Sequence, residues 1–345
     1  MHTTRLEKLL KQLPKNSAFY ITDAEDMLYY ASFSGEGAVV ISEKEKLVIT
    51  DGRYTEIAQK ECKGFEVLSI SDLYKILKNL NCEIFVQADH ISYNSFLKLQ
   101  KEVGRISPSD VNFDALRSVK DEQEISYLKK AAEIAEAVYL ETLKFIKQGK
   151  TEKETAAFID YQLKLKGADG NSFDTICVSG ANTSLPHGVP TDKKFIEGDF
   201  ITMDFGCRVN GYCSDMTRTV ALGSLTDEMA NVYNVVLKAQ LEASSNIKAG
   251  ADCKELDLIA RNIIKEAGYG EYFSHSLGHG VGLKIHEMPN LSPKSEAILR
   301  SGNIVTVEPG IYIPGKFGVR IENTMIVREN FGGNLQKSSK ELIIL

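Results

Sequence analysis

The chain has 345 residues, of which 43% are hydrophobic and 26% are charged, and its formal net charge is −6. This acidic balance excludes a general affinity for nucleic acid or an anionic membrane, because binding to either requires a basic surface. No run approaches the ~18 apolar residues of a membrane helix, and the start of the chain lacks the apolar core of a secretion signal, so we expect a cytoplasmic protein.

The first third of the chain alternates short apolar runs with helical patterns. The apolar runs predict strands at residues 37–41, 46–50 and 83–86. The amphipathic patterns predict helices at residues 5–13, 54–62 and 71–79. Because strands and helices alternate, we expect an α/β domain.

Residues 107–110 break this pattern, and we expect a domain boundary near residues 108–118. The length of the chain exceeds what one hydrophobic core normally supports, so we expect two domains, at residues 1–115 and 116–345. The second domain opens with a long amphipathic helix that begins at Lys120 and ends before Gly149.

The second domain contains a faint internal repeat. At one constant offset, Ile146, Lys147, Gly149, Lys153, Glu154, Lys164 and Gly167 recur as Ile247, Lys248, Gly250, Lys254, Glu255, Lys265 and Gly268. Each copy is a helix end, a break with glycine and a second helix that stops at glycine. Chance similarity between two ordinary helix pairs is the alternative. We favour a duplicated α/β unit whose halves enclose a site, because both halves continue to a His-Gly-Val sequence.

Five side chains with metal-binding chemistry follow, each in its own short motif: Asp204, Asp215, His279, Glu308 and Glu322. Four carboxylates and one imidazole form an oxygen-rich ligand set. Such a set suits a pair of Mn²⁺, Co²⁺, Fe²⁺ or Zn²⁺ ions better than a structural zinc, which favours thiolates. The sequence therefore predicts a site for two metal ions.

A predicted hairpin would bring the two aspartates together. Asp204 lies in a strand at residues 201–206, and Asp215 follows a turn at Asn210 and Gly211. Two carboxylates held close together repel each other unless a cation neutralises them. A surface Asp and a turn Asp would be the ordinary explanation of a single pair.

Two glutamates repeat this layout, which favours the metal site over the ordinary explanation. Glu308 ends a predicted strand at residues 305–308, and Glu322 ends another at residues 319–322. A turn rich in proline and glycine separates the two strands.

Three histidines stand in constrained surroundings. His279 lies among glycines, which let the backbone approach closely, and it precedes His286 by seven residues. An imidazole ligand needs such a fixed orientation. His187 is flanked by two prolines, so it lies in a rigid loop that is suited to aiming a hydrogen bond.

Together these motifs resemble those of the Xaa-Pro peptidases, aminopeptidase P and prolidase, which belong to the pita-bread superfamily of metallopeptidases. The motifs are Pro186-His187-Gly188, Met203-Asp204-Phe205-Gly206, Ser214-Asp215-Met216-Thr217-Arg218-Thr219, Gly278-His279-Gly280-Val281-Gly282-Leu283, His286-Glu287-Met288-Pro289, Glu308-Pro309-Gly310-Ile311-Tyr312 and Arg320-Ile321-Glu322-Asn323. The resemblance implies an α/β (α+β) fold, with a small creatinase-like N-terminal α/β domain before a pita-bread domain with pseudo-twofold halves.

The resemblance also implies a role for each metal ligand. Asp204 would chelate one metal, and His279 and Glu308 would complete the other. Asp215 and Glu322 would bridge both. A hydroxide between the metals would attack the scissile carbonyl, and Glu308 would act as general base and then as general acid. Mn²⁺ is the favoured ion, with Co²⁺, Zn²⁺ and Fe²⁺ as alternatives.

Three further residues take roles from the same resemblance. His187 and His286 would donate hydrogen bonds to the substrate and to the oxyanion. Arg320, two positions before the bridging glutamate, is typical of the proline-directed members. It would position the substrate, a role compatible with pairing to a ligand carboxylate.

We interpret the chain as an enzyme, a dinuclear metal-dependent exopeptidase that removes an N-terminal residue preceding proline. Its partners would be proline-containing peptides, and we expect a homodimer. The alternative is a prolidase restricted to Xaa-Pro dipeptides. We favour the aminopeptidase because Thr50-Asp51-Gly52-Arg53-Tyr54 and the last six residues look more like that branch.

Two other members of the superfamily suggest different functions. One is a catalytically inactive pita-bread protein that only binds, and the other is a creatinase-like enzyme that works without metal. The presence of all five ligands and both accessory histidines disfavours each of them.

Overall fold

The computed structural model describes residues 2–345. The described chain forms two compact units, one that ends at Leu116 and one over Arg117–Leu345. We keep the proposal of a domain boundary between residues 115 and 116, which this division supports. In the described part of the chain, no helix is both long enough and apolar enough to cross a membrane.

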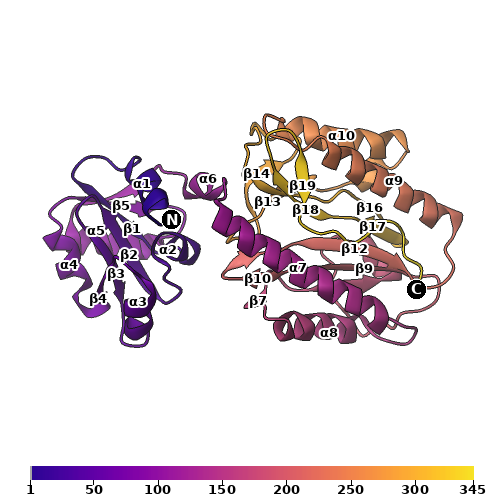
Figure 1. Ribbon diagram of the computed structural model, residues 1–345, viewed down its shortest axis with the longest axis horizontal. Helices are drawn as coiled ribbons and strands as arrows, with labels where there is room; N and C mark the ends of the chain where they lie inside the picture. Colours follow the sequence, from indigo (N-terminus) through magenta and orange to yellow (C-terminus); the bar gives the residue numbers. More distant parts are fainter. Residues whose placement is uncertain (1) are drawn as a thin grey trace. The chain divides into compact units, whose positions relative to one another are not determined.

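The N-terminal unit is built on one mixed six-stranded sheet in the order β4-β3-β2-β1-β5-β6 (Figure 1). Its strands are β1 (Ser17–Ile21), β2 (Gly37–Ser42), β3 (Lys46–Thr50), β4 (Glu66–Ser69), β5 (Glu83–Gln87) and β6 (Ile106–Ser109). Its helices are α1 (His2–Leu10), α2 (Ala24–Ala31), α3 (Thr55–Glu61), η1 (Ile70–Asp72), α4 (Leu73–Asn79), α5 (Tyr93–Val103) and α6 (Phe113–Arg117). The strands and helices predicted for this unit are confirmed within a few residues at their ends.

The break predicted at residues 107–110 is wrong, because β6 covers most of that stretch. Pro108 lies in β6 and pairs in parallel register with Val86 of β5. The strand is at the edge of the sheet. Proline has no N–H to donate, and an edge strand is the place in a sheet where this loss is tolerated.

The C-terminal unit has two halves with the same plan, as the repeat predicted. Two helices lie on each side of the strands (Figure 1). The helices are α7 (Glu122–Phe145) and α8 (Glu152–Leu165) in the first half, and α9 (Asp227–Ser245) and α10 (Cys253–Glu266) in the second. Gly149 and Gly250 follow the first helix of each pair with φ of 88° and 84°. Glycine adopts this left-handed conformation without strain.

Short strands fill the space between the helix pairs. The first half holds the sheet β12-β9-β8 and the sheet β11-β10-β7, and the second holds β14-β13-β15-β18-β19 and the hairpin β16-β17. First-half elements are β7 (Gly170–Asn171), β8 (Ile176–Ser179), η2 (Gly180–Ser184), β9 (Phe200–Phe205), β10 (Cys207–Val209), β11 (Tyr212–Cys213) and β12 (Met216–Ala221). Second-half elements are η3 (Gly270–Tyr272), β13 (Gly278–Gly280), β14 (Glu287–Leu291), β15 (Ile304–Val307), β16 (Gly310–Ile313), β17 (Phe317–Arg320), β18 (Asn323–Val327) and β19 (Gly332–Asn334).

Helix α7 begins at Glu122, two residues after the predicted start at Lys120, and a capping box explains the start. The Asp121 side chain accepts hydrogen bonds from the first turn, and the Glu124 side chain accepts one from the Asp121 N–H. The predicted apolar face of α7 is buried against the first-half strands, where Val138 joins a cluster with Phe205 and Met216.

A buried ion pair joins the start of the C-terminal unit to β14. The ammonium of Lys120 lies 2.9 Å from the carboxylate of Glu287, and their side chains are 1% and 0% exposed. Removing one partner of a buried pair costs about 3–5 kcal/mol. Arg117 lies 3.5 Å from the same carboxylate. If Lys120 is replaced, Arg117 still compensates part of the Glu287 charge.

We therefore expect Lys120→Met to lower the free energy of unfolding by about 3 kcal/mol, at the low end of that range. Urea denaturation of the variant measures the change. The control is Lys130→Met, which breaks an exposed pair with Glu133 and should cost less than about 1 kcal/mol. Equal effects of the two substitutions would contradict the prediction.

Candidate metal centre

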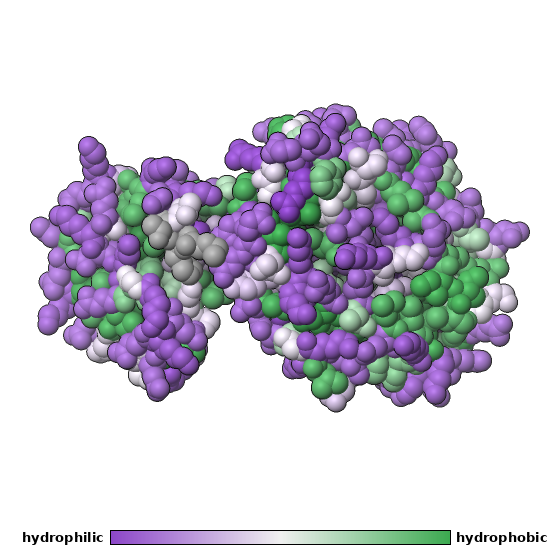
Figure 2. All heavy atoms as spheres, in the orientation of Figure 1, coloured by the Kyte–Doolittle hydropathy of each residue, from purple (hydrophilic) through white to green (hydrophobic). Residues whose placement is uncertain are grey.

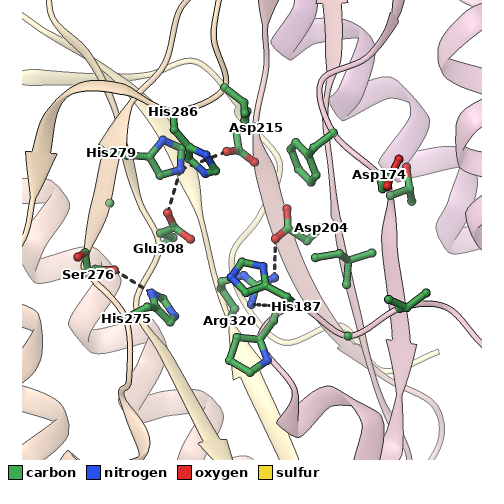
Figure 3. A pocket seen from close by; sticks show the side chains of 18 of the residues that line it. Asp174, His187, Asp204, Asp215, His275, Ser276, His279, His286, Glu308 and Arg320 are labelled. Atoms are coloured by element: carbon green, nitrogen blue, oxygen red, sulfur yellow. Dashed lines mark hydrogen bonds and ion pairs between the residues drawn. The ribbon is translucent and has the colours of Figure 1, made fainter. Parts of the chain in front are cut away.

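The five predicted ligands converge between the two halves of the C-terminal unit, beside a cavity of about 610 Å³. Figure 3 shows the labelled side chains Asp204, Asp215, His279 and Glu308 facing a common space. The ligands come from different elements: Asp204 from β9, Asp215 from the residue before β12, His279 from β13, Glu308 from the residue after β15, and Glu322 from the link between β17 and β18.

The predicted hairpin brings Asp204 and Asp215 together, with an interruption in the middle. Strands β9 and β12 are antiparallel, and Thr217 pairs with Asp204. The outer part of the hairpin, β10 and β11, turns at Asn210 and Gly211, which have φ of 50° and 80°. These positive φ values fit the two-residue turn that closes a tight hairpin.

Glu308 and Glu322 also become neighbours, but the predicted pairing of their strands is wrong. Strand β15 pairs with β18, and Val307 lies opposite Asn323. The residue after Val307 and the residue before Asn323 therefore lie side by side. Pro309 has no N–H to continue the ladder past Glu308, and the next strand, β16, pairs with β17 instead.

Three of the ligands lie close enough to hold one ion. One potential ligand atom from each of Asp215, His279 and Glu322 lies within 4.8 Å of the other two. Nε2 of His279 is also 3.2 Å from Oε1 of Glu308. The carbonyl oxygen of Gly280 lies 3.1 Å from Nδ1 of His279. This carbonyl accepts a hydrogen bond from Nδ1–H in the tautomer that leaves the Nε2 lone pair for a metal.

The carboxylates of this cluster repel one another strongly. Burial, and then the Glu322 carboxylate, raise the pKa of Asp215 well above its usual value. Burial and the Glu308 carboxylate raise the pKa of Glu322 in the same way. At an effective dielectric constant of about 20, two like charges 4 Å apart repel by about 4 kcal/mol. A cation in the cluster would remove this cost.

Glu308 differs from the other three carboxylates because its pKa is lowered and not raised. Burial raises its pKa, but the hydrogen bond and the charge of His279, together with the charges of His275 and Arg320, outweigh burial and lower the pKa to about 2. Oε1 of Glu308 also accepts a hydrogen bond from Oγ1 of Thr306, at 3.1 Å. Glu308 is therefore the carboxylate that stays ionised most readily.

Two orphaned oxygens show that the residues fit a bound cation. One oxygen of Asp204 accepts a hydrogen bond from Arg320, and one oxygen of Glu322 accepts a hydrogen bond of 2.7 Å from Thr217. Their other oxygens, Oδ1 of Asp204 and Oε1 of Glu322, are buried and have no hydrogen-bond donor within the described chain. Buried polar atoms are almost always satisfied, and a divalent ion would satisfy both oxygens.

The predicted accessory histidines both line the cavity. His286 packs edge-on against His279, with ring centroids 4.4 Å apart. His187 lies on the opposite side of the cavity, in the loop after η2 (Figure 3). Both side chains are exposed to the cavity, so their ring nitrogens are accessible to a substrate.

Arg320 holds several parts of the site together. Its guanidinium donates hydrogen bonds to Asp204, to Oγ1 of Thr217 at 3.1 Å, to the carbonyl of Pro186 at 3.1 Å and to the hydroxyl of Tyr312 at 2.8 Å. The planar fork of an arginine can serve these directions at once. Arg320 therefore fixes the orientation of the Asp204 carboxylate.

Two residues of the site escaped the sequence analysis. Nε2 of His275 lies 2.8 Å from the hydroxyl of Tyr312, which in turn accepts the hydrogen bond from Arg320. Tyr312 stood in a recognised motif without a role of its own. His275 stands four residues before His279, and this spacing was the one signal that could have found it.

Comparisons with known proteins agree with this geometry. A model described as "Metallopeptidase family M24" matches residues 126–329, and one described as "Creatinase/Prolidase N-terminal domain" matches residues 4–119. A curated relative, the Xaa-Pro dipeptidase of Pyrococcus furiosus, is 40% identical over 347 residues, which cover 98% of this chain and 99% of the relative. The chain belongs to metallopeptidase family M24.

Solved structures of similar proteins align with this M24 peptidase over nearly its whole length. An Xaa-Pro dipeptidase from Bacillus anthracis aligns with a TM-score of 0.96 at 40% identity and covers 100% of both chains. An X-Pro aminopeptidase from Thermotoga maritima aligns with a TM-score of 0.92 at 39% identity, covering 99% of this chain and 100% of that one. The predicted resemblance and the mixed α/β fold are thereby confirmed, and the chain is an enzyme, a metal-dependent exopeptidase.

In this M24 peptidase, Arg320→Lys keeps the positive charge but loses the planar fork. We expect kcat/KM for a proline peptide to fall about 10- to 100-fold, the usual effect of removing a group that orients a metal ligand. Steady-state kinetics at saturating metal measures the effect. Arg208→Lys, the same change at an exposed position of β10, should leave kcat/KM unchanged. The role given to Arg320 is wrong if both variants match the wild type.

Proposed function

We propose that the chain is an Xaa-Pro dipeptidase, a prolidase that hydrolyses the bond between an N-terminal residue and a C-terminal proline. The observation that carries the proposal is the buried carboxylate cluster beside a partly open cavity, in a chain 40% identical to a named Xaa-Pro dipeptidase over nearly its whole length. The cavity volume of about 610 Å³ lies within the range of about 300–1,000 Å³ that is typical of small-molecule sites. The named relatives thus support the dipeptidase over the aminopeptidase that we favoured from the sequence.

Two divalent ions would be held by the five predicted ligands. Asp215 and Glu322 would bridge the ions, Asp204 would complete one site, and His279 with Glu308 would complete the other. The short distances among Asp215, His279 and Glu322 support one ion held by these three residues. The buried oxygens of Asp204 and Glu322 that lack a hydrogen-bond donor support contacts of these two residues with an ion. We favour Mn²⁺, although oxygen and imidazole ligands also accept Co²⁺, Fe²⁺ or Zn²⁺.

When bound, the metals would polarise the scissile carbonyl and lower the pKa of water. Glu308 lies beside His279 at the cavity wall, where it is placed to take a proton from water and pass it to the proline nitrogen. His187 and His286, on opposite sides of the cavity, would donate hydrogen bonds to the substrate and to its carbonyl oxygen as this oxygen gains charge. Arg320 holds the Asp204 carboxylate in position throughout.

A second candidate is an Xaa-Pro aminopeptidase that accepts longer peptides. The solved X-Pro aminopeptidase from Thermotoga maritima, at 39% identity and a TM-score of 0.92, favours it. The cavity also has an exposed apolar rim, since Val189 lines it and is 77% exposed. A rim of this kind would leave room for residues beyond the proline.

One assay separates the candidates. Purified protein is loaded with Mn²⁺ and incubated with Gly-Pro, with Gly-Pro-Ala and with Gly-Ala, each with and without a chelator. We expect chelator-sensitive cleavage of Gly-Pro alone. Cleavage of Gly-Pro-Ala as well would favour the aminopeptidase. Cleavage of neither proline peptide under Mn²⁺ or Co²⁺ would refute both.

The homodimer is also a proposal. Hydrophobic residues gather on the C-terminal unit beside the C-terminus (Figure 2), where Ile344 is 61% exposed. Exposed apolar patches often mark contacts between proteins. Sedimentation velocity at micromolar concentration should give a dimer, and a monomer there would contradict the proposal.

A further inference from the structure

A buried glutamate outside the metal centre has an unusual number of hydrogen-bond donors around it. Glu152, the first residue of α8, is 0% exposed. Its carboxylate accepts hydrogen bonds of 2.7–3.2 Å from the N–H and hydroxyl of Ser179, the side-chain amide of Asn182, and the N–H and hydroxyl of Thr191. A carboxylate is well placed at a helix N-terminus, where the helix dipole favours negative charge.

These donors lie at the two ends of one stretch of chain, residues 179–191, which we call the His187 segment. It begins at the last residue of β8, passes through η2 and ends at Thr191. The start of α8 holds the same end through its backbone, since the Lys153 N–H donates to the Thr191 carbonyl at 3.1 Å. The carboxylate of Glu152 therefore closes the base of a loop.

The His187 segment forms one wall of the cavity. Residues 186–190 all line it, and His187 lies in their middle. The Pro186 carbonyl accepts a hydrogen bond of 3.1 Å from Arg320. The segment also rests on β17, where the Gly318 N–H donates to Oγ1 of Thr183 at 2.8 Å.

The His187 segment packs closely against β17. A Cβ at Gly318 would lie 2.2 Å from the carbonyl oxygen of Thr183, so the two backbones are already in contact. A small shift of the segment would therefore move Pro186 away from Arg320 and His187 away from the metal ligands. Displacements of about 1 Å at a reacting centre can lower rates about 100-fold.

We propose that Glu152 is a positioning residue for the peptidase reaction, which clamps both ends of the His187 segment so that His187 and Pro186 face the metal centre. The inference rests on the proposed function, because it assigns Glu152 a part in that reaction. Glutamine has nearly the same shape as glutamate, but its NH₂ group would point a donor at the donors of Ser179 or Thr191. Glu152→Gln should therefore open one end of the segment.

The first test compares Glu152→Gln with Glu154→Gln. Glu154 lies in the same turn of α8, but its side chain is exposed and accepts hydrogen bonds from the Thr151 N–H and from Lys150, outside the His187 segment. We expect Glu152→Gln to lower kcat/KM about 10- to 100-fold, with the metal content unchanged. Glu154→Gln should keep the wild-type kcat/KM. Wild-type kinetics in Glu152→Gln would overturn the proposal.

A double-mutant cycle with His187→Ala separates positioning from a general loss of stability. If Glu152 acts through His187, Glu152→Gln should lower the rate little further in the His187→Ala background. Losses that multiply in the double variant would show that Glu152 acts elsewhere, and they would overturn the proposal.

Hydrogen exchange gives a readout that does not depend on activity. In Glu152→Gln, the amides of Ser179 and Thr191 should exchange faster than in the wild type, and in Glu154→Gln they should not. This comparison remains valid even if the wild type cleaves no proline peptide, so a failure of the proposed function is distinguishable. Unchanged exchange at both amides would overturn the clamp.

A milder variant covers the case in which Glu152→Gln does not fold. Thr191→Val removes one hydroxyl donor and keeps the shape of the side chain. We expect a smaller fall in kcat/KM and faster exchange at Thr191 in this variant. Wild-type values of both quantities would overturn the proposal.

Discussion

Asp215→Asn is expected to abolish peptidase activity, with kcat falling at least about 1000-fold, the upper range for losing one preorganised charge-stabilising group. Asp215 lies at the centre of the cluster, within reach of His279 and Glu322. An amide oxygen is a weaker ligand than a carboxylate and cannot bridge two ions in the same way. Steady-state kinetics and metal analysis of the purified variant measure the loss. Near wild-type turnover would show that the metal assignment is wrong.

The same variant should be more stable than the wild type when both are free of metal. Burial, and then repulsion from the Glu322 carboxylate, raise the pKa of Asp215. The neutral amide removes that repulsion, which amounts to at most about 4 kcal/mol per pair of charges at an effective dielectric constant of about 20. The control is Asp257→Asn, which breaks a buried pair with Arg261 at 2.8 Å and should destabilise the protein. Destabilisation by both substitutions would argue against repulsion in the metal-free cluster.

The five proposed metal ligands could be found in the sequence because each stands in a short motif. Asp204 and Asp215 are also close in sequence, so a local hairpin is enough to bring them together. Glu308 and Glu322 were placed correctly at strand ends, but their strands pair with different partners than predicted. Register between strands is decided by side-chain packing across the whole sheet, and one hydrophobic pattern does not contain that information.

The hydrogen bonds that hold the site in position could not be predicted in the same way. The contact of Arg320 with Pro186 joins residues 134 positions apart, and the contact of Glu152 with Thr191 spans 39 positions. Glu152 carries no local signal, because an isolated acidic side chain is normally a surface residue. His275 carries only the weak signal of its position four residues before His279. Their roles follow from the tertiary fold.

Strand β1 of the N-terminal unit is an element of secondary structure that the sequence pattern did not predict. All of its residues are buried, because it lies inside the sheet between β2 and β5. A strand buried on both faces has no alternation of polar and apolar residues. A short apolar run of this kind cannot be separated from a buried helical segment by periodicity.

Removal of the metals should destabilise the protein, and the effect should grow as the pH rises. Burial holds the pKa values of Asp215 and Glu322 well above their usual 3.8 and 4.5 in the metal-free fold. The folded chain then keeps protons that the unfolded chain has released. The corresponding stability is complete below the unfolded pKa values and is lost as the pH rises through the raised folded values.

His279 and Glu308, which form a pair, do not reverse this loss of stability with rising pH. Burial lowers the pKa of His279, but the hydrogen bond and charge of Glu308, the Gly280 carbonyl and the charge of Asp204 together raise it. Its contribution is therefore also lost as the pH rises through the raised pKa. The pKa of Glu308 is lowered to about 2. Its contribution is present above the unfolded pKa and is lost as the pH falls toward 2, which lies below the range of the experiment.

Bound metal should act in the opposite direction. Each ion that binds only the folded state adds about 2.7 kcal/mol at a concentration 100 times its Kd. Protons compete with the metal for the same carboxylates, so metal binding strengthens as the pH rises. Thermal unfolding with Mn²⁺ and with a chelator, at pH 5 and pH 8, should give a difference in Tm that is larger at pH 8. In Asp215→Asn the dependence on pH should be weaker, because one of the shared protons is gone. If the chelator does not change the Tm of the wild type at pH 8, the buried carboxylates hold no metal. Their repulsion would then require another explanation.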